Sequence, residues 1–278
     1  MRNSLKPFQE GDKIFIVLFI IKDLLPVDSS QDDMINTGFT LFSGCPCDNH
    51  NLVMILHPGN RIVKTENCPL SSSKDGFYIL NHDGNFQRVA GDKRKPEEMT
   101  LEEIKELSIE GEPVATLEEA LKATEGKGIL FIELKGSTAD HRMADDAVKT
   151  VKENGMEDEC VLIGMNYELI DYIETNYPEI QTGYLTFASF GDTAKLNCDY
   201  LAMEEESATA EVISEIHKQG KKVLVWTSNE KRAQRHFLCS MIDGLITDNA
   251  SQAMQLIQEL SERSDLRRMG DRLLELLS

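Results

Sequence analysis

From residue 74 onward, the chain alternates short β-rich runs with helices that carry clear start and stop signals. Thr100 and Thr116 each begin a capping box, because a glutamate follows three residues later and an apolar helix face comes after it. The expected strands begin roughly 18–32 residues apart, which is the step of repeated βα units in a parallel sheet. This pattern predicts an α/β fold, with a (β/α)8 barrel of the TIM type as the architecture. A doubly wound open sheet is the main alternative, but no glycine-rich phosphate fingerprint supports it.

The expected elements follow from local periodicity and from the residues that end each run. Strands are expected at 77–80, 129–132, 161–163, 182–185, 200–203, 223–226 and 244–247. Helices are expected at 167–176, which Pro178 stops, at 211–219, which Gly220 stops, and at 251–259. A further helix is expected to carry Met143, Ala147 and Val151 on one side.

Residues 1–73 differ in character from the rest of the chain. They carry a net charge of −2, against −17 for residues 74–278, and they hold three of the six cysteines. We therefore expect an atypical N-terminal segment at 1–73 that can supply barrel strands, a barrel at 74–260 and an amphipathic helix at 261–278. For residues 1–73, the alternative is a truncated or frame-shifted gene start, which would explain the change at residue 74. For the last helix, the alternative to packing on the barrel is a dimer contact.

The overall charge and the cysteine pattern exclude several classes of protein. A net charge of −19 argues against nucleic-acid binding, which needs a basic stripe on the protein. The cysteines are scattered and no signal peptide is present, so we expect a reducing, cytoplasmic location. The apolar run from Ile14 to Ile21 is too short to span a bilayer, which takes about 20 residues.

Two groups of polar residues follow expected strands. His82 and Asp83 come directly after the run 77–80, and a histidine at a strand exit can serve as a general acid or base. Glu133 and Lys135 alternate with apolar residues and so share one face of their strand. A carboxylate beside an ammonium suits one metal ligand and one phosphate contact. The alternative is an internal ion pair that closes the barrel core.

Two later strands end in Glu204 and in Trp226. Glu204 is a candidate for orienting a cation or a substrate hydroxyl. Trp226 is the only tryptophan and is a candidate for an apolar wall against the substrate head group, with a core position as the alternative.

Taken in order, these motifs resemble those of the glycerophosphodiester phosphodiesterase family. The resemblance covers about residues 74–256. It is carried by Lys74-Asp75-Gly76, His82-Asp83, Arg88, Gly91, Met99-Thr100, Glu103-Ile104, Ala115-Thr116-Leu117-Glu118-Glu119, Ile132-Glu133-Leu134-Lys135, Asn166-Tyr167, Pro178-Glu179, Thr182-Gly183-Tyr184, Met203-Glu204, Val225-Trp226-Thr227 and Ile246-Thr247-Asp248.

The resemblance implies a (β/α)8 barrel that hydrolyses small glycerophosphodiesters to glycerol 3-phosphate and an alcohol. It implies two histidines acting as base and acid, with a divalent cation, Mg²⁺ or Ca²⁺, on the phosphate. His82 would be the acid that protonates the leaving alcohol, Glu133 a metal ligand and Lys135 a group that neutralises phosphate charge. Membrane association stays open, because some family members carry a membrane domain ahead of the barrel, and so does the oligomeric state.

The N-terminal motifs of the family are not intact in this chain. The family places His-Arg-Gly at the end of the first strand and Glu-x-Asp on the second, and the Glu-x-Asp positions fall on Asn67 and Pro69 here. Glu66 is one residue out of register, which in a strand turns a side chain to the other face. His57 is the candidate replacement for the first histidine, although few residues separate it from Lys74; the alternative is a turn histidine.

Two functions remain open on this basis. One is an active phosphodiesterase in which the N-terminal region supplies unconventional ligands. The other is a catalytically impaired barrel of the same family that binds a ligand or a partner.

Overall fold

The computed structural model describes residues 52–57, 61–109, 111–126, 129–136, 138–187, 195–249 and 252–260, with the backbone alone for 52–57 and 61–68. The expected helix at 261–278 and the apolar run at 14–21 lie outside these residues. None of the helices within the described ranges is long and apolar enough to cross a membrane.

The large sheet contains β1 (Leu52–His57), β2 (Arg61–Ser72), β3 (Tyr78–Leu80), β6 (Leu130–Leu134), β7 (Cys160–Gly164), β8 (Gln181–Thr186), β9 (Tyr200–Glu204), β10 (Lys222–Trp226) and β11 (Gly244–Leu245). The helices are α1 (Gln87–Ala90), α2 (Leu101–Lys105), α3 (Leu117–Thr124), α4 (His141–Glu153), α5 (Tyr167–Asn176), α6 (Ala210–Lys218), α7 (Lys231–Leu238) and a helix at 252–260. A small second sheet pairs β4 (Ser108–Ile109) with β5 (Glu112–Pro113).

The strands of the large sheet follow the order β1-β2-β6-β7-β8-β9-β10-β11, with β3 paired to β2. Neighbours from β2 to β11 are parallel, whereas β1 and β3 are both antiparallel to β2. Cα atoms of β1 approach those of β11 within 8 Å, so the two edges of the curved sheet come together. The α/β class and barrel architecture are confirmed, and β1 is the strand at which the barrel departs from a regular parallel one.

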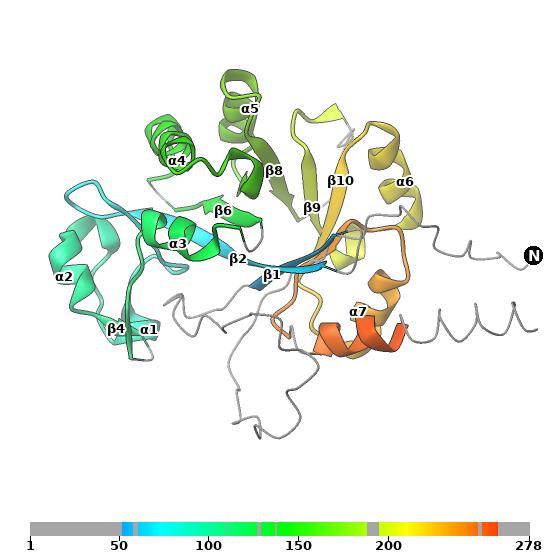
Figure 1. Cartoon of the computed structure of the whole chain (residues 1–278), viewed down its shortest axis with the longest axis horizontal. Coiled ribbons are helices and arrows are strands. Elements are labelled where there is room, and N and C mark those ends of the chain that lie inside the picture. Colours follow the sequence, from blue (N-terminus) through cyan, green and yellow to red (C-terminus); the bar gives the residue numbers. More distant parts are fainter. Residues whose placement is uncertain are drawn as a thin grey trace, which may run out of the picture.

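Each capped helix begins where its sequence predicts. The side chains of Thr100 and Thr116 accept hydrogen bonds from the backbone N–H groups of Glu103 and Glu119, and both capping boxes are complete. Asp140 caps α4 in a similar way, through a bond from Met143 N at 2.9 Å. Of these helices, α3 and α4 lie against the sheet (Figure 1), where their apolar faces form the larger core with strand residues.

The barrel interior is filled by alternate residues of successive strands. Phe131, Ile163, Tyr200, Leu224 and Ile246 belong to one buried cluster. The rings of Phe131 and Tyr200 meet edge to face, with centroids 5.6 Å apart. Because strand residues two apart share a face, Glu133 and Lys135 follow Phe131 toward the interior at the carboxyl end of β6.

Residues between β3 and α3 form an insertion that stands beside the barrel (Figure 1). It contains α1, α2, β4, β5 and the 3-10 helix η2 (Pro96–Glu98). Its own small core consists of Ile79, Phe86, Met99, Ile104, Ile109 and Val114, all buried. The insertion is also tied to the turn after β2, because Asp75 accepts a bond from Leu101 N at 3.0 Å.

His217 and Asp243 join α6 to the start of β11, and their contact predicts a pH-dependent stability. Nε2 of His217 lies 2.6 Å from Oδ2 of Asp243, and this hydrogen bond raises the pKa of His217. The pair therefore contributes its full stabilisation below the unfolded pKa of about 6.5, and the contribution is lost as the pH rises through the raised pKa.

We expect His217→Gln to lower the melting temperature by about 2–4 °C more at about pH 5.5 than at about pH 9. His236 is exposed and makes no such pair, so His236→Gln is the matched control. Equal losses for His217→Gln at both pH values would contradict the assignment.

Candidate active site

The candidate active site lies at the carboxyl ends of the parallel strands, where barrel enzymes place their chemistry. His82 follows β3, Lys135 follows β6, and Glu204 and Trp226 are the last residues of β9 and β10. The barrel therefore brings residues from distant parts of the chain to one edge of the sheet, which we call the mouth.

His82 is held by groups on both sides of its ring. Its Nδ1 lies 2.9 Å from Oδ1 of Asp83, and Arg88 donates from Nε to the other carboxylate oxygen at 2.7 Å. The hydrogen bond from Arg88 is the main reason why the pKa of Asp83 is lowered. The carboxylate is thus kept charged and fixes the orientation of the histidine.

The second ring nitrogen of His82 faces Lys135. Nζ of Lys135 lies 2.8 Å from Nε2 of His82. An ammonium group only donates, so Nε2 is the acceptor and the neutral imidazole carries its proton on Nδ1, toward Asp83. The structure thereby brings together two of the predicted site residues, 53 positions apart in the chain.

A cavity of about 180 Å³ opens at this pair, between the barrel and the insertion. Pockets for larger ligands usually measure about 300–1,000 Å³, so this volume suits a group the size of a phosphate. The lining includes Ser71, Asn81, His82, Lys95, Lys135 and Thr138.

Glu133 lies deeper than His82 and Lys135, with 5 % of its surface exposed. The residues that lie opposite it on β2 decide whether a cation site can form. In the parallel ladder Glu133 is paired with Pro69 of β2, and Asn67 is paired with Phe131. Pro69 offers no oxygen ligand where the family motif has a carboxylate. The described side chains also contain no group of three histidine, cysteine or acidic residues that could hold a metal ion. These residues do not fit a divalent cation.

The structure does not bring His57 to the mouth, which corrects the expectation that it replaces the first histidine. β1 is antiparallel to β2, and His57 is paired with Arg61 at the start of β2. Arg61 lies eight residues before Pro69, which corresponds to roughly 26 Å along a strand. The reversed direction of β1 therefore leaves His57 at the opposite end of the sheet from His82.

Glu66 does not reach the position opposite Glu133 either. It is paired with Leu52 in the β1–β2 hairpin and lies three residues before Pro69. The backbone of β2 continues through Pro69, whose carbonyl accepts a bond from Asn81 N at 3.0 Å.

Trp226 and Glu204 lie side by side at the ends of β10 and β9, where they are paired in register. The indole of Trp226 packs on the interior cluster and meets the exposed ring of Phe187 edge to face, with centroids 4.9 Å apart. The ring of Trp226 thus packs partly in the core, and its role as an apolar wall for the substrate stays a prediction.

Two further residues at the mouth have no role in the sequence interpretation. Asp248 follows β11, and burial raises its pKa while a bond from Asn229 and the nearby His82 act to lower it. Lys95 reaches the cavity from the insertion. Two sequence features could have pointed to these residues: the motif Ile246-Thr247-Asp248 and the basic run Lys93-Arg94-Lys95. Neither feature indicates by itself which segments lie together in the fold.

Comparison with known proteins identifies the family of this chain. The model of the glycerophosphoryl diester phosphodiesterase family matches residues 69–252, about two-thirds of the chain. The chain belongs to this family. The match begins at Pro69, so the family pattern starts within β2 and includes His82, Glu133 and Lys135.

Individual relatives are distant. The chain is 24% identical over 204 residues to a glycerophosphodiester phosphodiesterase from Caldanaerobacter subterraneus subsp. tengcongensis, covering 67% of this chain and 83% of that protein. A phosphodiesterase from Oleispira antarctica, solved in complex with the product sn-glycerol-3-phosphate, matches with a TM-score of 0.63 and 22% identity. That match covers 69% of this chain and 84% of the other. A glycerophosphodiester phosphodiesterase from Thermotoga maritima matches with a TM-score of 0.57 and 24% identity, over 69% and 83% of the two chains. These structures share the fold.

Proposed function

We propose that this protein hydrolyses glycerophosphodiesters to glycerol 3-phosphate and an alcohol. The observation that carries the proposal is the contact of His82 with Lys135 at 2.8 Å, beside a phosphate-sized cavity. The contact places an imidazole, which can gain and give up a proton, beside a cation, and cleavage of an anionic phosphodiester needs both proton transfer and charge neutralisation. The product bound to the Oleispira antarctica relative supports this class of substrate.

In the proposed reaction, the oxygen of a water molecule forms a bond to phosphorus, the bond between phosphorus and the alcohol oxygen breaks, and the proton released by the attacking water passes to the solvent. His82 donates the proton that the departing alcohol takes up. When His82 is protonated, its Nδ1–H points to Asp83, and its Nε2–H serves the leaving alcohol once Lys135 has turned from the ring to the phosphate. Lys135 then contacts the phosphate oxygens and offsets the charge that develops on them. Trp226 and Glu204 contact the rest of the substrate.

A divalent cation, Mg²⁺ or Ca²⁺, remains a prediction from the family resemblance. Glu133 would be one ligand of such a cation, which would supply positive charge at the phosphate. The pairing of Glu133 with Pro69 argues against a family-type site, and the steps above do not depend on one. A cytoplasmic location and a lack of nucleic-acid partners are predicted by the cysteine pattern and the net charge of −19.

The second candidate function is a barrel that binds a glycerophosphodiester or a partner without hydrolysing it. Pro69 favours this candidate, because it occupies the position of a family carboxylate. Among the described residues, no second histidine contacts His82, whose ring lies against Asp83 and Lys135.

An activity assay separates the two candidates. The purified full chain is offered glycerophosphocholine or glycerophosphoethanolamine with Mg²⁺, with Ca²⁺, with Mn²⁺ or with a chelator, and the release of glycerol 3-phosphate is measured. Turnover above the protein-free rate in any of these conditions is the expected result. Binding of either substrate without turnover in all of them would favour the non-catalytic barrel.

A further inference from the structure

The phosphate-sized cavity is lined by two lysines that come from different parts of the fold. Lys135 extends from the carboxyl end of β6, and Lys95 comes from the insertion, immediately before η2. Asp83 and Glu97 are the acidic residues of the same lining. Asp83 is already engaged by Arg88 and His82, which leaves Glu97 against two ammonium groups. The cavity is therefore locally suited to an anion in a chain whose net charge is −19.

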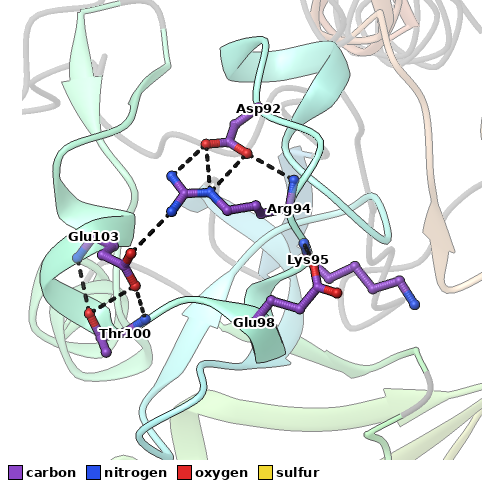
Figure 2. A network of polar contacts seen from close by, with 6 residues as sticks. All are labelled: Asp92, Arg94, Lys95, Glu98, Thr100 and Glu103. Carbon is purple, nitrogen blue, oxygen red and sulfur yellow. Dashed lines mark hydrogen bonds and ion pairs between the residues drawn. The ribbon is translucent and has the colours of Figure 1, made fainter.

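The segment that carries Lys95 is fixed by its neighbours rather than by Lys95 itself. Arg94 donates to Asp92 and, at 3.1 Å, to Glu103 of α2. Glu103 also accepts from Thr100 N at 2.9 Å. Figure 2 shows this network on one side of Lys95, with the long side chain of Lys95 directed away from it.

The backbone of Lys95 is held as well. Its N–H donates to Oε2 of Glu98 at 2.9 Å, which closes the capping box of η2 (Figure 2). The Cα of Lys95 thus has a fixed position at the cavity rim, while its ammonium group remains exposed and available. A fixed backbone reduces the ordering cost of a contact between Lys95 and a ligand.

The metal-ligand position of the family is altered in the same site. Glu133 is the carboxylate of the motif on β6, and its partner in the ladder is Pro69, whose side chain carries no ligand atom. A phosphodiester still carries a negative charge that must be offset for binding and cleavage. The described cations close enough to serve are Lys135, Lys95 and, when protonated, His82.

We propose that Lys95 and Lys135 bind the phosphate group of the ligand together, and that this binding does not require a divalent cation. The identity of the ligand rests on the proposed function, whereas the anion site rests on the cavity and its two lysines. Lys95 is then a binding residue supplied by the insertion, and the insertion becomes part of the active site.

The test is calorimetric titration of the full chain with glycerol 3-phosphate, in a chelator and in Mg²⁺ or Ca²⁺. We expect dissociation constants that agree within about twofold, since charge-assisted hydrogen bonds from the lysines supply the binding. Binding that weakens by about tenfold or more in the chelator, or no binding in any condition, would overturn the proposal.

Variants of the insertion test the part played by Lys95. Lys95→Gln is expected to weaken binding by about tenfold in the chelator, the loss of one charge-assisted contact, and Lys95→Arg to remain within about threefold of the parent. Lys93→Gln removes the same charge from an exposed position outside the cavity and is expected to bind like the parent. Equal binding by Lys95→Gln and Lys93→Gln would refute a role for Lys95.

The two proposals fail in different ways. Chelator-resistant binding of glycerol 3-phosphate without turnover of any diester would contradict the proposed hydrolysis and support the lysine site. Turnover together with binding that appears only in Mg²⁺ or Ca²⁺ would support hydrolysis and contradict the lysine site.

Discussion

Replacing His82 with alanine is expected to lower the rate of diester hydrolysis by at least about 100-fold, the usual contribution of a positioned general acid. The imidazole is held by Asp83 on one side and faces Lys135 on the other, so no neighbouring group can take its place in the same geometry. The release of glycerol 3-phosphate at saturating glycerophosphocholine measures the loss. Because His82 is partly exposed, we expect the melting temperature to change little.

His236→Ala is the control for this experiment. His236 is exposed on α7, and its recorded contact is with the ring of Phe237. This variant should keep the full rate. Activity in His82→Ala close to that of His236→Ala would remove His82 from the reaction.

The double variant Asn67→Glu/Pro69→Asp is expected to create a dependence on divalent cations, which we do not expect of the parent chain. It restores the carboxylates of the family motif on β2, and residue 69 lies in register with Glu133 on the adjacent strand. Neighbouring strands are about 4.8 Å apart, which allows the two carboxylates to share one cation. Without a cation, buried like charges should destabilise the variant.

We expect Mg²⁺ or Ca²⁺ at about 100 times its dissociation constant to stabilise this variant by about 2.7 kcal/mol, seen as a rise in melting temperature of several degrees. The isosteric variant Asn67→Gln/Pro69→Asn supplies no carboxylates and should show no rise. A similar rise in the parent protein would mean that a cation site exists without these two carboxylates.

Much of the fold could be predicted from local signals. The boxes at Thr100 and Thr116 set two helix starts, and the alternation around Phe131, Glu133 and Lys135 gave one face of a barrel strand. These features depend on neighbours within a few residues. The folded protein keeps these helix starts and this strand because the tertiary contacts favour the same local structures.

The direction of β1 could not be predicted in the same way. A short apolar run such as Leu52–His57 fits a parallel or an antiparallel strand equally well, and only its pairing with β2 decides which. His57 was expected at the mouth because a parallel β1 was assumed, and the antiparallel pairing places it at the other end of the sheet. Lys95 was missed for a related reason, because the approach of η2 to β6 depends on how the whole insertion packs.

The separate core of the insertion has a consequence for how this protein can change over evolutionary time. Substitutions at sites that share no contacts have nearly additive effects on stability, so changes around Phe86 or Met99 need not disturb the packing inside the barrel. One wall of the cavity can therefore diverge while the opposite wall, from β6, stays the same. Descendants of this chain could acquire new ligand preferences through the part of the insertion around Lys95 and keep His82 and Lys135 in place.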